Sequence, residues 1–211
     1  MSRSRTAVAR SRLSRRFAGR GPRRRRVVLA LLLPLLVLPA CAYYNTFYYA
    51  KRYYRQAEKL VQAAGSDKLP PEAARKYDDS IKQSGKVIKY HGTSRWVDDA
   101  LYLMGAAYYG KREYEEALRK FDELVTNYPD SGFVPWALYR SGLCHYERKN
   151  YEQMEAYFHR VRDGHPEFER QDDLVFIEAR AAEDQRQRPV AVRRYRELVG
   201  AFPKSPRSAE A

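Results

Sequence analysis

Small and apolar residues recur along the chain with a step of 37 residues. Phe121, Phe158 and Tyr195 are related by this step, and so are four further sets: Pro129, Pro166 and Pro203; Leu124, Val161 and Leu198; Gly105, Gly142 and Ala179; and Tyr77, Tyr114 and Tyr151. Between these positions, apolar residues follow the three- and four-residue spacing of amphipathic helices. Each proline ends a helix, because the residue before a proline disfavours the α conformation. The pattern therefore predicts stacked helical hairpins that bury their apolar faces against their neighbours.

Ahead of the periodic region, the pattern predicts a less regular hairpin. We expect one long helix up to Ala64, a loop, and a second helix from Pro70-Pro71 to about His91, since proline suits the first helical turn. Thr93 or Ser94 would cap the helix that follows. The whole is an all-α solenoid of about four antiparallel helix pairs. The expected segments are an N-terminal segment (residues 1–40), the irregular hairpin (41–94), three repeat units (95–131, 132–168 and 169–205) and a tail (206–211).

Each periodic unit resembles the tetratricopeptide repeat. The first full unit reads Leu101-x2-Met104-Gly105-x2-Tyr108-x5-Tyr114-x2-Ala117-x3-Phe121-x7-Pro129. Gly105 and Ala117 are small where the two helices of a hairpin would cross closely, and the aromatic residues would fill the space beside the crossing. The usual repeat has about 34 residues, so each unit here is slightly longer, and we place the extra residues in the turn between units. The resemblance implies a tetratricopeptide-type solenoid in which the first helix of each pair lines a concave face.

Charge changes this picture only at the N-terminus. The formal net charge is +14, but residues 1–40 hold eleven arginines and neither lysine nor acid, so the remainder carries +3. This remainder lacks the strongly basic surface that nucleic-acid binding requires. Residues 27–40 form an apolar run of 14 residues, shorter than the roughly 20 residues of a membrane-spanning helix. Such a run behind a basic flank is typical of a cleaved export signal.

The apolar run ends in Leu38-Pro39-Ala40-Cys41, which resembles a lipobox. The resemblance implies a signal peptide that is cleaved before Cys41. The Cys41 thiol would then carry a diacylglyceryl group, and palmitate-type acyl chains would give stable anchoring. Two alternatives stay open: an uncleaved signal anchor, and an ordinary secretory signal in which the cysteine is coincidental. Alanine rather than aspartate follows the cysteine, which favours the outer membrane.

Two further segments are distinctive: Cys41-Ala42-Tyr43-Tyr44-Asn45-Thr46-Phe47-Tyr48-Tyr49-Ala50-Lys51-Arg52-Tyr53-Tyr54, and Trp96-Val97-Asp98-Asp99-Ala100-Leu101. With the lipobox and the repeats, they resemble the BamD-like family of outer-membrane assembly lipoproteins over about residues 38–205. The resemblance implies a lipid-anchored scaffold on the periplasmic face of the outer membrane of a Gram-negative-type bacterium. It implies subunits of the β-barrel assembly machinery, or unfolded barrel proteins, as partners. The alternative is a periplasmic scaffold of the Tol-Pal or cell-division type. Members of the BamD-like family carry five repeats, whereas about four helix pairs are expected in this sequence. The partner contacts that family members make at the C-terminal end are therefore not expected to transfer unchanged.

An aromatic stripe is the predicted partner-binding surface. Seven side chains of the first helices are expected to point to the concave face: Tyr102, Tyr109, Trp136, Tyr139, Tyr146, Phe176 and Arg180. Large rings with a hydroxyl or indole donor suit the capture of a peptide, and Arg180 would meet a peptide carboxylate. The alternative is that single rings only pack between adjacent helices. For the tyrosines between Tyr43 and Tyr54, packing on the first hairpin and contact with the lipid interface are both open.

The side chains that catalysis requires show no recognisable arrangement. None of the four histidines is spaced from another ligand type as a metal pair, and His145 takes a core position of its repeat. Asp98-Asp99 and Asp172-Asp173 fall at predicted helix starts, where acids interact favourably with the helix dipole. Cys144 is expected to be a small buried side chain. We predict a protein that is not an enzyme and has no metal or cofactor apart from the covalent lipid on Cys41.

Overall fold

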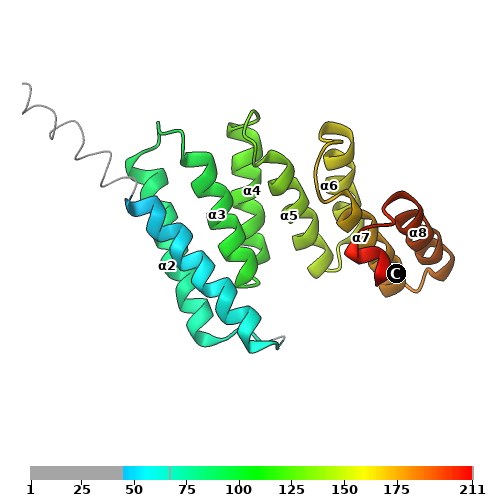
Figure 1. The fold of residues 1–211 in the computed structure, drawn as a ribbon. Helices are drawn as coiled ribbons and strands as arrows, with labels where there is room; N and C mark the ends of the chain where they lie inside the picture. The colour runs from blue at the N-terminus through cyan, green and yellow to red at the C-terminus, as the bar shows by residue number, and fades with distance from the viewer. Residues whose placement is uncertain (1–44, 67, 211) are drawn as a thin grey trace, which may run out of the picture. The chain divides into compact units, whose positions relative to one another are not determined.

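The computed structural model describes residues 45–66 and 68–210, and every regular element within them is helical (Figure 1). A first helix covers residues 45–64. It is followed by α2 (Pro71–Tyr90), α3 (Val97–Gly110), α4 (Tyr114–Asn127), α5 (Val134–Glu147), α6 (Tyr151–Gly164), α7 (Gln171–Asp184), α8 (Arg188–Ala201) and a short 3-10 helix, η1 (Pro206–Ala209). The prediction of an all-α solenoid of helical hairpins is confirmed. The proline pair opens α2 as predicted, and α2 ends one residue before the predicted His91.

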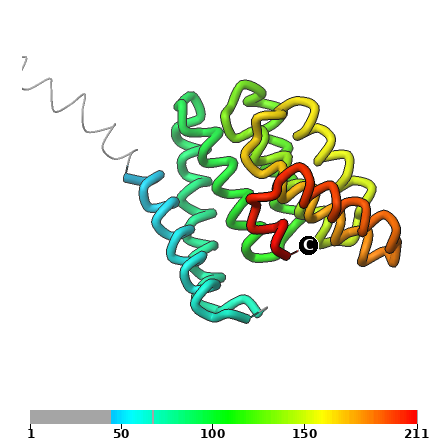
Figure 2. Tube along the Cα trace, turned by 45° about the vertical axis from the view of Figure 1, so that its right-hand side comes forward, coloured from blue at the N-terminus to red at the C-terminus, as the bar shows by residue number. Residues whose placement is uncertain are grey.

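Successive helix pairs stack in the order of the chain (Figure 2). The helices α3, α5 and α7 begin 37 residues apart, and so do their partners α4, α6 and α8. Each of these six helices has 14 residues. The two helices of a pair pack on each other, and α5 contacts both α3 and α7. The first helices of successive pairs therefore lie side by side, as the repeat predicts.

A glycine and a phenylalanine meet where the two helices of a pair cross. A Cβ atom at Gly105 would stand 2.6 Å from Cε1 of Phe121, so only glycine leaves room for the ring. The Phe121 ring is fully buried. Gly142 and Phe158 meet in the same way in the next pair. The small residue thus allows a large ring to be enclosed between two closely packed helices.

The turn inside each of these pairs has one backbone conformation. Arg112, Lys149 and Arg186 have φ angles of 63°, 60° and 60°, in the left-handed region. In the third turn, the N–H of Arg186 donates to the carbonyl of Glu183, and the N–H of Gln187 donates to the carbonyl of Ala182. This is the Schellman pattern of helix ends. Glycine takes this conformation without strain, so each of the three turns carries a conformational cost.

Serine hydroxyls connect the turns between pairs to the helix starts. Ser131 donates to Oδ2 of Asp98 at 2.6 Å, and Ser205 donates to Oδ2 of Asp172 at 2.5 Å. The same Oγ atoms accept from the backbone N–H two residues later, at 3.2 Å and 3.0 Å. Each serine therefore fixes its own turn and links it to the preceding pair. These contacts give Asp98 and Asp172 a partner in addition to the helix dipole.

The predicted cap of α3 by Thr93 or Ser94 is wrong. Among the described residues, no side chain caps the first turn of this helix, which starts after Trp96. Ser94 Oγ instead accepts from the N–H of Trp96, at 3.3 Å, within the preceding turn. Ser94 lies two residues before Trp96, the N-cap position of α3, so its side chain caps none of the helix N–H groups.

Buried side chains form a continuous core from α3 to α7, with Leu101, Phe121, Phe158 and Leu174 among its largest members. A smaller group joins Phe47 of the first helix to α2 and α3. Within residues 45–66 and 68–210, no helix has both the length and the apolarity that crossing a bilayer requires.

Candidate partner-binding site

Arg140 of α5 lies among tyrosines of the first helix and of α3. Its guanidinium carbon is 5.1 Å from the ring centre of Tyr109, a cation–π contact. Its side chain also interacts electrostatically with Tyr102 and Tyr54. These four residues, Arg140, Tyr54, Tyr102 and Tyr109, form the Arg140–tyrosine site.

A hydrogen-bonded pair lies behind Tyr54. The Tyr54 ring centre is 5.8 Å from that of Tyr77 in α2, and the Tyr77 hydroxyl donates a short hydrogen bond to Oε1 of Glu58. Burial raises the pKa of Tyr54, Tyr77 and Tyr109, so these phenols stay neutral. Glu58, the acid of this pair, accepts from the Tyr77 hydroxyl and forms no ion pair with Arg140 among the described residues.

The guanidinium of Arg140 has no counter-charge in the part of the chain that the structure describes. Its Nε atom is shielded from solvent and has no hydrogen-bond partner there. Arginine stays protonated in proteins, and a shielded charge without a counter-charge is costly. The two buried carboxylates of the described chain, Asp173 and Glu178, both have arginine partners. The Arg140–tyrosine site is therefore suited to a carboxylate that comes from another molecule.

Tyr102 and Tyr109, two of the predicted surface residues, belong to this site. Both are partly buried. The Tyr102 ring stacks on Phe133 with 4.9 Å between ring centres, and the Tyr109 ring centre is 5.6 Å from that of Tyr114. Each tyrosine thus combines packing between neighbouring elements with contact to Arg140.

Trp136 and Tyr139 form a second aromatic group with Phe168. Their ring centres lie 5.0 Å and 5.7 Å from that of Phe168. Tyr139 is 8% exposed and its hydroxyl donates to Oδ2 of Asp173 at 3.4 Å. Burial, together with the Asp173 charge, raises the pKa of Tyr139 to about 12. This burial differs from the exposed position that the predicted stripe requires, because Tyr139 fills the junction between α5 and α7. Trp136 is partly buried.

The last three predicted residues also differ from a simple exposed stripe. Phe176 is 6% exposed, and the Arg207 guanidinium covers its ring at 4.9 Å. Tyr146 is partly buried beside Tyr151. Arg180 is exposed, but its Nε lies 3.7 Å from the carboxylate of Glu183. Arg180 already has a counter-charge, so Arg140 is the better receptor for a peptide carboxylate.

Sequence reasoning missed Arg140, although the repeat contains a signal for it. By the 37-residue step, Arg140 corresponds to Leu103 in the preceding unit and Ile177 in the following one. The equivalent residues in the neighbouring units are apolar. A cation at such a position indicates a charge on the side of the helix that faces the core.

Two reactive side chains on α5 take part in packing. Cys144 is fully buried, and burial raises the pKa of its thiol to about 12. The His145 ring stacks on Tyr157 with 5.3 Å between ring centres, and burial lowers the pKa of His145. In residues 45–66 and 68–210, no three His, Cys, Asp or Glu side chains are grouped so that they could hold a metal ion.

The chain matches a known protein family. The family model YfiO, described as an outer membrane lipoprotein, matches residues 63–211. This range covers α2 to η1 and includes Arg140, Tyr102 and Tyr109. The chain belongs to the YfiO family. YfiO is the BamD family of tetratricopeptide-repeat lipoproteins, so the predicted family is confirmed. No curated protein matches the chain.

YfiO membership also gives the location of the protein, which is lipid-anchored at the outer membrane. The YfiO match starts after most of the first helix, so Tyr54 and Glu58 lie before it. Cys41 and the predicted signal over residues 1–40 lie outside the described residues as well as outside the match. Lipidation at Cys41 therefore stays a prediction from the lipobox.

Proposed function

We propose that this protein is a non-enzymatic scaffold of the β-barrel assembly machinery, anchored through an acylated Cys41. In this proposal, the Arg140–tyrosine site binds the C-terminal end of an unfolded barrel protein, with an aromatic last residue. The observation that carries the proposal is the shielded guanidinium of Arg140, which has tyrosines around it and no carboxylate from the described chain.

The chemistry of such a peptide end complements the site. A terminal carboxylate can accept two parallel hydrogen bonds from a guanidinium, which adds direction to the charge attraction. An aromatic last residue can pack on tyrosine rings, which offer large apolar area at a low entropy cost. The first helices of successive pairs lie side by side, so the rest of an extended peptide can follow them toward Trp136.

Peptide binding tests this assignment directly. A fluorescein-labelled peptide that ends in phenylalanine with a free carboxylate is titrated with the protein, and fluorescence anisotropy gives Kd. A charge-assisted hydrogen-bonded pair contributes about 1.5–3 kcal/mol, so Arg140→Gln is expected to weaken binding roughly 10- to 100-fold. Amidation of the peptide end should weaken binding to the unmodified protein by a similar factor.

Arg180→Gln is the matched control, because it removes a cation from the originally predicted position that already has an acidic partner. It should leave the affinity for the free-carboxylate peptide unchanged. The Arg140→Gln protein should bind both peptide forms with the same weak affinity. If the amidated peptide binds the unmodified protein as well as the free carboxylate does, Arg140 is not a carboxylate receptor.

The cellular role needs a separate measurement. Depletion of the protein should lower the amounts of β-barrel proteins in the outer membrane, and the protein should co-purify with a large membrane β-barrel. Normal barrel levels combined with recovery of envelope-constriction proteins would instead assign it to a Tol-Pal or cell-division scaffold.

A further inference from the structure

One face of the first helix is exposed and basic. Tyr48, Arg52, Arg55 and Lys59 follow each other at spacings of four, three and four residues, so they share one side of the helix. All four are exposed, while Phe47, Ala50 and Ala57 on the opposite side are buried. The same four residues, with Lys51 and Gln56, line a shallow groove. We call the four residues the outer face.

The cations of the outer face are not used inside the described structure. Arg52, Arg55 and Lys59 form no ion pair with any residue in 45–66 or 68–210, whereas the neighbouring Lys51 lies 3.9 Å from Asp99 and over the Phe47 ring. The acid of this helix, Glu58, accepts from Tyr77. Within residues 45–66 and 68–210, the outer face therefore presents three cations without an ion-pair partner and includes no anion.

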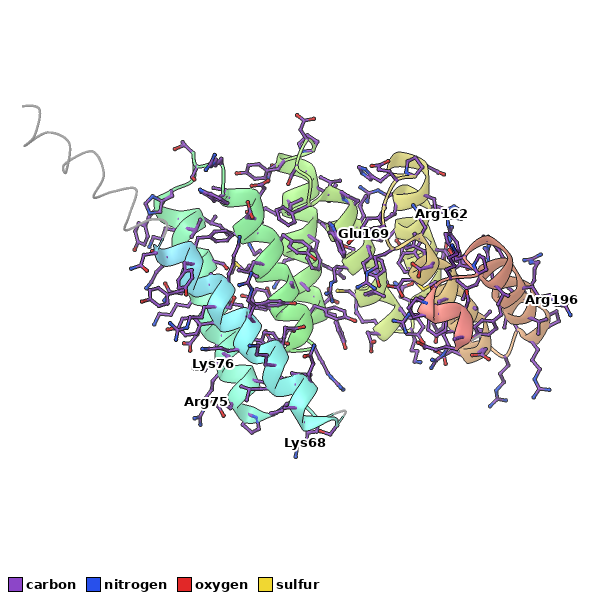
Figure 3. All side chains as sticks on the ribbon, in the orientation of Figure 1. Lys68, Arg75, Lys76, Arg162, Glu169 and Arg196 are labelled. Carbon is purple, nitrogen blue, oxygen red and sulfur yellow. The ribbon has the colours of Figure 1, made fainter. Side chains whose placement is uncertain are left out.

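Charge is unevenly divided along the mature chain. Residues 41–96 contain eleven Lys or Arg and five Asp or Glu, a net charge of +6, whereas residues 97–211 contain eighteen and twenty-one, a net charge of −3. The basic excess thus belongs to the first helix pair, where Figure 3 also shows Arg75 and Lys76. Non-specific attraction of anions would not require the positive charges to gather in the first helix pair.

The lipid tether would lie next to this basic end. Three residues lie between Cys41 and the start of the first helix at residue 45, so the four steps from Cys41 to residue 45 can span at most about 14 Å. A basic segment beside an acyl anchor adds membrane affinity, because anionic headgroups attract it within about a Debye length of 8 Å. Tyr48 and Tyr49 are 49% and 37% exposed, and tyrosine is favoured at the membrane–water boundary.

We propose that the outer face binds the headgroups of anionic phospholipids. This inference uses the outer-membrane location of the protein and adds a second membrane contact to the acyl chains. The contact holds the first helix along the membrane, so that the acyl tether and the helix together fix the direction in which the solenoid leaves the bilayer.

The test uses a form of the protein without acyl chains. A chain that begins at Ala42, exported behind a signal without a lipobox, keeps the unit from Tyr43 onward, which is compact on its own. Co-sedimentation with phosphatidylcholine vesicles, with and without phosphatidylglycerol, measures partitioning at low and high salt. Binding is expected to require phosphatidylglycerol and to fall as salt screens the charges.

Two triple variants separate the outer face from general charge. Arg52→Gln/Arg55→Gln/Lys59→Gln is expected to weaken partitioning roughly 100-fold, since each cation near an anionic surface contributes about fivefold. Arg188→Gln/Arg193→Gln/Arg196→Gln removes the same charge from exposed positions on α8, at the other end of the stack (Figure 3), and should change partitioning by less than about twofold. Circular dichroism checks that both variants keep their helices.

Three results would overturn the inference: no binding to phosphatidylglycerol vesicles, equal loss in both triple variants, or no loss in the first. The assay contains neither peptide nor acyl chain. Its failure would therefore leave peptide binding at Arg140 and acylation at Cys41 untouched, and their failure would not affect its result.

Discussion

A methyl group added at Gly105 tests the crossing of α3 and α4. The new Cβ would stand 2.6 Å from Cε1 and 2.8 Å from Cδ1 of Phe121, whereas non-bonded carbons prefer about 3.5–4.0 Å. The ring cannot move away freely, because it is fully buried and the Tyr102 ring centre is 6.0 Å from its own. Gly105→Ala must therefore force the two helices apart or tilt the ring.

The expected size of the effect follows from two opposing contributions. Alanine is favoured over glycine in a helix interior by about 1 kcal/mol. Overpacking a filled core costs about 1–3 kcal/mol, and a contact that is about 1 Å too short belongs at the upper end of this range. We expect Gly105→Ala to lower the free energy of unfolding by about 2 kcal/mol.

Urea unfolding followed by circular dichroism measures this loss, and α2 supplies the control. A Cβ atom at Gly85 would have no neighbour within 4 Å, so Gly85→Ala should raise the free energy of unfolding by about 1 kcal/mol. Phe121→Leu should partly rescue Gly105→Ala, because the smaller side chain leaves room for the methyl group. If Gly105→Ala and Gly85→Ala are equally stabilising, the close crossing described above is incorrect.

Two further substitutions test the turns and the core. Arg186→Gly should raise the free energy of urea unfolding by about 1 kcal/mol, because φ is 60° at this position and glycine removes the cost of the left-handed conformation; an unchanged or lower value would contradict this. The pKa of His145 is lowered from 6.5 by burial and by the Arg148 charge, so the unfolded chain takes up the proton first. Stability from neutral His145 is full above pH 6.5 and is lost as pH falls below it. His145→Phe should remove this part of the pH dependence when thermal unfolding is compared at pH 7.5 and pH 5, and identical pH profiles would refute the assignment.

The helices could be predicted from the sequence because their positions follow a single period of 37 residues. Three consecutive pairs repeat the same small, aromatic and proline positions, and the helix starts of the structure follow the same 37-residue step. The left-handed turns could not be predicted, because arginine or lysine occupies the position where glycine would be the usual signal. Hydrogen bonds of the Schellman pattern hold these residues in place, and they depend on the helix end as a whole.

The candidate site was harder to predict, for a geometric reason. The first helix α5 contacts its own partner α6 and also α3 and α7, the first helices on both sides, so only a narrow strip of its surface is free. A helical projection places Tyr139 and Phe176 on that strip, but the seam between α5, α7 and their neighbours buries both. The angle at which helices cross decides which rings are covered, and the sequence periodicity does not contain this angle.

The treatment of shielded charge differs between α7 and α5. Asp173 and Glu178 of α7 are 2% and 4% exposed, and each lies against two arginines from neighbouring elements. A buried charge that is kept for packing alone needs such partners, because an unpaired one costs several kcal/mol, on the order of 3–5. Arg140 departs from this rule: its Nε atom has no hydrogen-bond partner among the described residues, and its register position holds Leu103 and Ile177 in the neighbouring units. In the proposed function, an anion from outside the chain supplies the counter-charge that Arg140 lacks among the described residues.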